Sequence, residues 1–142
     1  MAFNITPYSY AQWQRIHFNS DQKNDPAISG YDADPNQNGI SNLHEYARGT
    51  PPLKSPVQNK TQLRIDESGA LDLDYKENTN ASETRMVPWT STDLIRWDPA
   101  ESLFSLPVEH EQNPAMKTIR QINEALDAKR FFTLDPEWIA SP

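Results

Sequence analysis

The sequence predicts an α+β fold, in which an N-terminal helix, a polar loop and a short helix pack on a small antiparallel β-sandwich. Three observations predict it. Apolar residues recur at three- and four-residue spacing in the first third of the chain, they alternate with polar residues from about residue 63 onward, and a proline-rich stretch at residues 50–56 separates the two patterns. We therefore expect a helical segment with its loop and connector over residues 1–57 and a β-sandwich module over residues 58–142.

The first helix is expected within residues 1–20. We expect Thr6 to be its N-cap and Pro7 its first helical residue, because that position needs no backbone donor. Tyr10, Trp13 and then either Ile16 or His17 recur at three- and four-residue spacing, which predicts that they share one helical face.

A polar stretch follows the first helix. Residues 21–42 are rich in Asp, Asn, Pro, Gly and Ser and are expected to form a loop that stays ordered only if something organises it. A second short helix is predicted over residues 41–48, with Gly49 at the C′ position, where a left-handed residue is favoured.

The second part of the chain has the alternation of half-buried strands. The clearest case is residues 71–75, which follow an expected hairpin turn at residues 67–70. For residues 122–128, a single helical turn is the alternative to a strand. We expect six or seven short strands, centred on residues 63–65, 71–75, 85–89, 95–97, 104–108, 117–122 and 130–134.

The composition excludes several classes of protein. The chain has 142 residues, a formal net charge of -7, a pI near 4.8 and no cysteine. Nucleic-acid binding is not expected, because it depends on clustered Lys and Arg. Membrane insertion is not expected either, because no apolar run approaches about 20 residues. The absence of cysteine excludes disulfides, thiolate catalysis and zinc–thiolate sites.

Residues 34–45 carry the most specific pattern in the sequence. Oxygen-bearing side chains occupy positions 1, 3, 5, 9 and 12 of this stretch, Gly39 occupies position 6, and position 7 offers its backbone carbonyl. This is the spacing of an EF-hand-like calcium loop, because Ca²⁺ takes about six to eight hard oxygens, which a short loop supplies by turning alternate side chains inward. The predicted calcium ligands are Asp34, Asn36, Asn38, Ile40, Asn42 and Glu45, with Asp32 as a candidate additional ligand.

The predicted site is weakly charged. Only Asp34 and Glu45 are carboxylates within the core pattern, and fewer carboxylates lower calcium affinity, so we expect a dissociation constant of roughly 10⁻⁵–10⁻³ M. The alternative is an Asx-rich loop held by its own hydrogen bonds between side chains and backbone.

Residues 34–49 have the sequence D-P-N-Q-N-G-I-S-N-L-H-E-Y-A-R-G. This stretch resembles a calcium-loop segment found near the C-termini of large secreted proteins of Verrucomicrobia, Planctomycetes and related bacteria. The loop is similar to those of dockerins and thrombospondin type 3 repeats. The resemblance is strongest in residues 26–51 and extends loosely to the β module after residue 84. The sequence departs from the family at Asn36 and Asn38, where aspartate is usual.

The resemblance implies a non-catalytic, calcium-binding accessory module of a secreted or cell-surface bacterial protein, although residues 1–4 lack the basic and apolar stretches of a signal peptide. Such segments sit beside catalytic domains in the same polypeptide, so carbohydrate binding or attachment in the service of a polysaccharide-degrading enzyme is the leading expectation. The alternative is a structural or protein-interaction module, dockerin-like and anchoring, with no glycan ligand. A dockerin would carry two such loops, and this chain has one.

The tryptophans divide into two groups. Trp13 and Trp97 are expected to be core residues, because a large aromatic side chain contributes much of the packing of a small domain. Trp89 and Trp138 are flanked by polar residues or proline, and we predict that they bind a glycan, since an exposed indole can stack on a sugar ring.

The sequence has no nucleophile elbow, phosphate-binding loop or zinc-binding helix motif, and we expect no enzyme activity. An autonomous hydrolase is the third hypothesis, because paired carboxylates such as Asp72 and Asp74 support glycoside hydrolysis in other proteins. The alternation of these residues with Leu71, Leu73 and Tyr75 instead predicts that the two aspartates form the solvated face of a strand.

Overall fold

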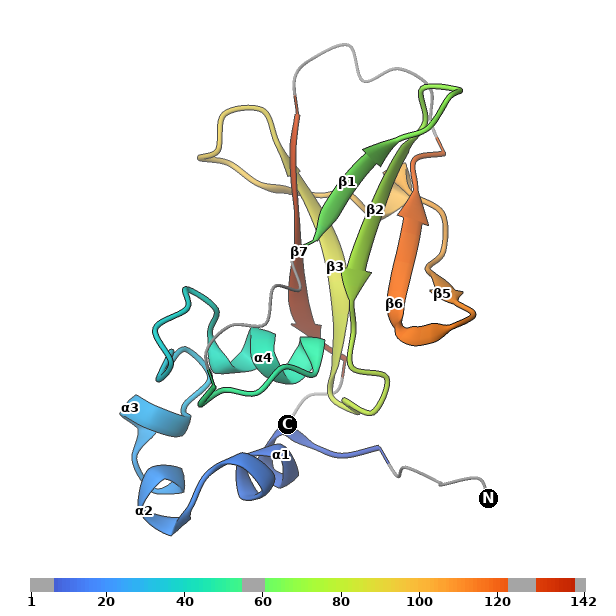
Figure 1. Cartoon of the computed structure of the whole chain (residues 1–142). Helices are drawn as coiled ribbons and strands as arrows, with labels where there is room; N and C mark the ends of the chain where they lie inside the picture. Colours follow the sequence, from blue (N-terminus) through green and yellow to red (C-terminus); the bar gives the residue numbers. More distant parts are fainter. Residues whose placement is uncertain (1–6, 55–60, 123–129, 140–142) are drawn as a thin grey trace. The chain divides into compact units, whose positions relative to one another are not determined.

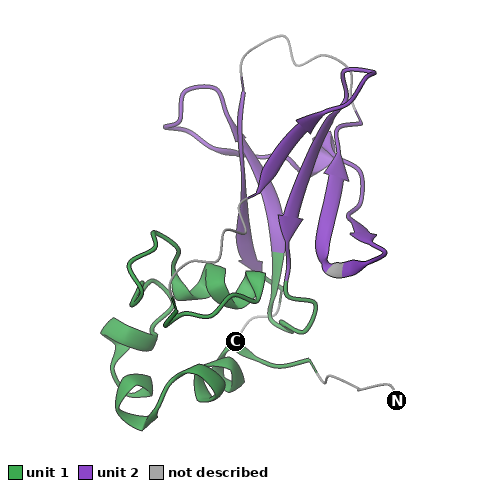
Figure 2. Ribbon diagram, viewed as in Figure 1, with its two compact units in different colours: residues 1–58, 78–85, 138–142 green, residues 59–77, 86–137 purple. Residues whose placement is uncertain are grey.

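The computed structural model describes residues 7–54, 61–122 and 130–139 (Figure 1). The described chain forms four α-helices and two antiparallel sheets, which confirms the predicted α+β fold class. It divides into two compact units (Figure 2). The first unit comprises residues 1–58, 78–85 and 138–142, and the second comprises residues 59–77 and 86–137.

Helix α1 (Tyr10–His17) begins at a capping box. The Ser9 hydroxyl accepts a hydrogen bond from the Gln12 N–H at 3.2 Å, and the Gln12 side chain accepts one from the Ser9 N–H at 2.8 Å. The predicted start at Pro7 is therefore wrong, because this reciprocal pair places the helix start at Tyr10. The predicted cap, Thr6, lies outside the described residues.

The stretch expected to be a loop contains two single-turn helices, α2 (Ser20–Lys23) and α3 (Pro26–Ser29). Asn19 caps α2 and Asp25 caps α3, each accepting a hydrogen bond from a backbone N–H of the first turn. The prediction was wrong here because the Asx residues that mark loops also start helices.

Helix α4 (Asn42–Arg48) confirms the second predicted helix. Ser41 is its N-cap, and Gly49 ends it in the left-handed region at φ 78°. The Gly49 N–H donates to the Glu45 carbonyl at 2.8 Å, which closes the last turn.

The core of the first unit is aromatic. Tyr10, Trp13, Phe18 and Tyr46 are buried, and the Trp13 ring centroid lies 5.2 Å from that of Tyr10 and 6.0 Å from that of Tyr46. The predicted core position of Trp13 is therefore confirmed. Of the two residues expected to continue its face, His17 does so, with its ring centroid 5.0 Å from that of Trp13, whereas Ile16 is 66% exposed. This packing joins α1 to α4, the helix that follows the predicted calcium loop.

The segment 78–85 belongs to the first unit through backbone hydrogen bonds. The Asn78 N–H donates to the Ala47 carbonyl at 2.7 Å, and the Tyr8 N–H donates to the Asn80 carbonyl at 2.7 Å. Two segments beyond the expected boundary at residue 57, residues 78–85 and 138–142, thus belong to the first unit. No local sequence pattern indicated that they do.

The two sheets have the strand orders β1-β2-β6-β5 and β4-β3-β7 (Figure 1). Leu73 and Tyr75 of the larger sheet are buried, and Phe104, bridged to Gln121, meets Phe132 of the smaller sheet edge-on at 5.5 Å. The strands are β1 (Gln62–Ile65), β2 (Leu71–Lys76), β3 (Thr84–Ser91), β4 (Asp98–Pro99), β5 (Val108–His110), β6 (Asn113–Arg120) and β7 (Phe131–Trp138), with the 3-10 helix η1 (Glu101–Leu103) before β5.

The predicted strand at residues 95–97 is wrong. The Asp93 carboxylate accepts hydrogen bonds from the N–H groups of Ile95 and Arg96 at 2.8 and 2.9 Å, which folds the segment into a loop. Ile95 is 86% exposed, and Trp97 is half-buried rather than a core residue. The other predicted strand centres overlap strands except residues 104–107, where β5 starts only at Val108.

Residues 123–128 of the stretch considered as a helical turn lie outside the described residues. Within the described ranges, no helix has the length and apolar character needed to cross a bilayer.

Candidate calcium-binding loop

Residues 34–40 form tight turns held by their own side chains. The two Asp34 carboxylate oxygens accept hydrogen bonds from the N–H groups of Asn38 at 3.2 Å and Gly39 at 2.8 Å. The Asn38 side-chain oxygen accepts one from the Ile40 N–H at 2.8 Å. Gly39 has φ 81°, a left-handed conformation that favours glycine, as its position in a calcium loop requires.

The Glu45 carboxylate lies where the loop and α4 meet. Glu45 is 1% exposed. Its Oε1 accepts hydrogen bonds from the side-chain amides of Asn36 at 3.3 Å and Asn38 at 2.8 Å, and its Oε2 accepts one from the Thr50 hydroxyl. These three donors are neutral side chains.

Asn42, at position 9 of the pattern, is fully buried. Its side-chain nitrogen donates to the carbonyls of Ile28 and Gly30 at 2.8 and 2.9 Å, but its side-chain oxygen is buried without a hydrogen-bond partner. An unpartnered buried amide oxygen costs free energy unless something supplies positive charge to it.

Asp32 is exposed and lies close enough to Tyr10 to influence it: burial first, then the charges of Tyr31 and Asp32, raise the pKa of the Tyr10 hydroxyl. The structure thus brings Asn36, Asn38 and Glu45 into direct contact, with Asp34 in the same turn, whereas Asp32 is exposed.

These residues fit a hard cation. The amide oxygens of Asn36 and Asn38 each accept one backbone N–H, from Asn38 at 3.3 Å and from Ile40 at 2.8 Å, and each keeps a second lone pair that a cation can use. Two carboxylates, amide oxygens and a backbone carbonyl are the ligands that Ca²⁺ prefers. No sequence pattern predicted the contact of Thr50 with Glu45. The one signal in the sequence was that a hydroxyl-bearing residue directly follows Gly49, the residue that turns the chain back toward α4.

The predicted glycan-binding tryptophans belong to different units. Trp138 is half-buried in the first unit, where its ring centroid lies 5.1 Å from that of Tyr31 and 6.5 Å from that of Tyr10. Trp89 is half-buried on β3 in the second unit.

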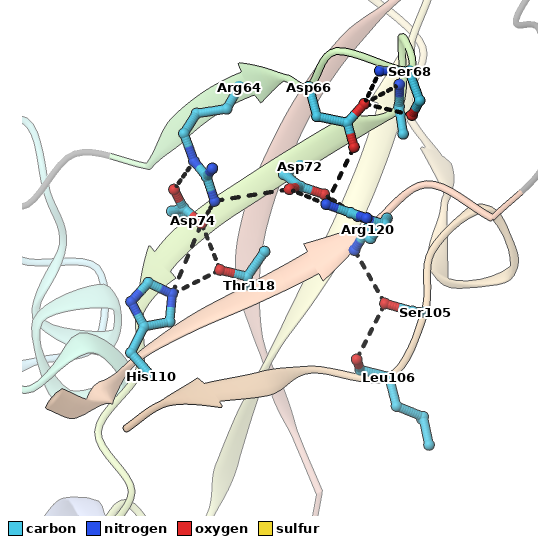
Figure 3. Close-up of polar contacts among 11 residues, drawn as sticks. Arg64, Asp66, Ser68, Asp72, Asp74, Ser105, Leu106, His110, Thr118 and Arg120 are labelled. Carbon is cyan, nitrogen blue, oxygen red and sulfur yellow. Dashed lines mark hydrogen bonds and ion pairs between the residues drawn. The ribbon is translucent and has the colours of Figure 1, made fainter. Parts of the chain in front are cut away.

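A second polar cluster lies on the larger sheet (Figure 3). The Arg120 guanidinium donates to both carboxylate oxygens of Asp72 at 2.8 and 3.0 Å, and Arg64 forms a two-pronged contact with Asp74. The hydroxyl of Thr118 donates to Asp74 at 2.5 Å.

The predicted solvated face is therefore wrong. Asp72 and Asp74 are only 3% and 7% exposed, because long arginine side chains from neighbouring strands cover them. Hydrogen bonds from Arg120 and Arg64 hold the pKa of each carboxyl below its ordinary value. A glycosidase acid needs a raised pKa, so this pair is suited to structural ion pairing rather than to proton donation.

This cluster predicts a dependence of stability on pH. Because the folded-state pKa values of Asp72 and Asp74 lie below the unfolded ones, the stabilisation is fully present above about pH 4–5 and is lost as the pH falls through the folded values. Arg120→Gln should lower the thermal midpoint by a few degrees at pH 7, and the difference from wild type should shrink near pH 2. The control is Arg96→Gln, whose side chain is 83% exposed. An equal deficit at both pH values would contradict this account.

The fold and the loop define an α+β protein with an Asx-rich loop in which the side-chain amides of Asn36 and Asn38 donate to a buried glutamate, Glu45. No family model, curated protein or solved structure matches the chain.

Proposed function

We propose that this chain is a non-catalytic, calcium-binding accessory module of a secreted or cell-surface bacterial protein, and that it binds polysaccharide beside a catalytic domain of the same polypeptide. The proposal depends on one observation. The Glu45 carboxylate is buried and accepts hydrogen bonds from the neutral side chains of Asn36, Asn38 and Thr50.

A buried carboxylate is costly unless a positive charge accompanies it. Calcium, when bound, would supply that charge, and Asp34, Asn36, Asn38, Asn42 and Glu45 together with the Ile40 carbonyl would hold it. The unpartnered oxygen of Asn42 supports the same interpretation. The family resemblance of residues 34–49 supports the assignment to a secreted accessory module.

The loop residues link the turn around Gly39 to helix α4. Asp34 and Asn38 fix the turns around Gly39, and Glu45 lies on the same helix as Tyr46, which is fully buried in the aromatic core. Ion binding at Glu45 is thereby coupled to the packing of α1 against α4.

Carbohydrate binding is supported by the aromatic side chains near Trp138. Tyr31 is 47% exposed and packs edge-on against Trp138, so a rigid aromatic pair reaches the surface of the first unit. Asp32 follows Tyr31 directly, and its carboxylate can accept hydrogen bonds from the hydroxyl groups of a sugar.

Trp138→Ala should weaken polysaccharide binding about tenfold, the equivalent of ~1.4 kcal/mol for one lost stacking contact. The measurement is retention of the calcium-loaded chain on an array of soluble and insoluble polysaccharides, followed by titration of the best ligand. Trp89→Ala tests the other predicted residue, and Trp97→Ala is the matched control. If the folded wild-type chain retains no polysaccharide, carbohydrate binding is ruled out.

The alternative is a protein-interaction module without a glycan ligand. It is favoured by the edge strand β1, where Leu63 and Ile65 lie opposite Leu73 and Leu71 but remain 55% and 69% exposed. An exposed apolar sheet edge is typical of surfaces that pair with another chain.

A further inference from the structure

The connector at residues 50–54 contacts the predicted calcium loop directly. Thr50 is 7% exposed, and its hydroxyl donates to Oε2 of Glu45. Its N–H donates to the Glu45 backbone carbonyl at 2.9 Å, beside the Gly49 N–H at 2.8 Å. The residues that follow α4 therefore donate hydrogen bonds to both the side chain and the backbone of Glu45.

Asn36 contacts the other end of the same connector. Its side-chain nitrogen lies 2.9 Å from the Lys54 carbonyl oxygen, 3.5 Å from the Pro51 carbonyl oxygen and 3.3 Å from Oε1 of Glu45. Three oxygens from separate parts of the chain thus surround one partially positive amide group. Asn36 thus adds hydrogen bonds to the connector at Pro51 and Lys54, beyond those made by Thr50.

A cation at the loop would strengthen this arrangement. The oxygen and the nitrogen of an amide point in different directions, so Asn36 can ligate through its oxygen while its nitrogen still donates to the connector. The Thr50 hydroxyl, in turn, fixes the orientation of a carboxylate that must present both oxygens to Ca²⁺. Residues that orient a metal ligand in this way influence affinity although they do not touch the metal.

We propose that the connector 50–54 is part of the calcium site: Thr50 is a positioning residue for Glu45, Asn36 fastens the Pro51 and Lys54 carbonyls, and calcium occupancy controls how accessible this segment is. The proposal rests on the calcium binding proposed above. It adds a regulated segment, because a protease or partner that needs the extended connector would act on the calcium-free form.

The experiment is limited proteolysis of the full chain with a lysine-specific endoproteinase that does not need calcium. Lys54 is exposed within the connector, and Lys23 of α2 is an exposed internal reference in the same unit. Mass spectrometry follows cleavage after each lysine in excess Ca²⁺ and in chelator. We expect Ca²⁺ to slow cleavage after Lys54 at least about tenfold more than cleavage after Lys23.

Variants at Thr50 separate positioning from general stability. Thr50→Val should lower calcium affinity about tenfold, within the range for residues that orient metal ligands, and should reduce protection at Lys54 even in saturating Ca²⁺. Thr50→Ser keeps the hydroxyl and should restore both. Thr92→Val, at an exposed threonine of the second unit, is the matched control.

The outcomes are distinguishable. If Ca²⁺ raises the thermal midpoint but leaves cleavage after Lys54 unchanged relative to cleavage after Lys23, the proposed role of the connector is wrong, whereas the proposed calcium binding is supported. Wild-type affinity and protection in Thr50→Val would likewise overturn the proposed role of the connector. If Ca²⁺ changes neither the midpoint nor the cleavage, the calcium assignment itself fails.

Discussion

Glu45→Gln should abolish calcium binding and leave the calcium-free protein at least as stable as wild type. Glutamine has nearly the same shape, its carbonyl can accept the amide donors of Asn36 and Asn38, and its N–H group can donate to the Thr50 hydroxyl. The substitution removes a buried negative charge, which is a net cost without a cation. With Ca²⁺ present it also removes the carboxylate that completes the coordination sphere.

The expected size of the effect follows from linkage. At a free Ca²⁺ concentration 100 times the dissociation constant, the wild type gains about 2.7 kcal/mol of unfolding free energy, and Glu45→Gln gains none. Isothermal titration calorimetry measures binding, and urea denaturation in chelator and in Ca²⁺ measures stability. Glu67→Gln, at an exposed turn position, is the control. A variant that still binds Ca²⁺ with wild-type affinity would contradict the ligand assignment.

Trp13→Ala should cost about 3–5 kcal/mol of unfolding free energy, the largest effect expected from a single core substitution in this chain. Trp13 is 1% exposed and contacts the rings of Tyr10, Phe18 and Tyr46. Removing the indole leaves a cavity between α1 and α4. Because Glu45 precedes Tyr46 on α4, the variant should also bind Ca²⁺ more weakly.

Urea denaturation in chelator measures this loss, and titration calorimetry measures the change in calcium affinity. Ile16→Ala is the matched control, because Ile16 lies on the same helix but is 66% exposed, and it should change stability by less than about 0.5 kcal/mol. A loss below about 1 kcal/mol in Trp13→Ala would mean that the aromatic cluster does not hold the first unit together.

Local patterns predicted the parts of the fold that local forces decide. The α4 helix was predicted because Ser41 and Gly49 are strong boundary residues, and β2 because Leu and Asp alternate strictly along it. The turn at Gly39 was predicted because a loop of this spacing needs a residue that tolerates positive φ.

The errors had two sources: distant residues that cover a face, and one local side chain that accepts backbone hydrogen bonds. Asp72 and Asp74 were expected to be solvated because alternation shows which face a residue takes, but not that Arg64 and Arg120 from neighbouring strands cover that face. The loop at residues 93–97 was missed because one aspartate can outcompete the strand tendency of Ile95 and Trp97. The contacts of Thr50 and Lys54 with the loop depend on the turn at Gly49, which brings the connector back over Glu45.

A calcium ion held by Glu45 and its neighbours should make the thermal unfolding of the wild-type chain depend on free Ca²⁺. The midpoint is measured in chelator and at increasing free Ca²⁺, with Mg²⁺ at equal ionic strength as a reference. We expect the midpoint to rise progressively with free Ca²⁺ across the range of roughly 10⁻⁵–10⁻² M, as linkage requires for a weak site. A midpoint that is the same in chelator and in Ca²⁺ would contradict this expectation.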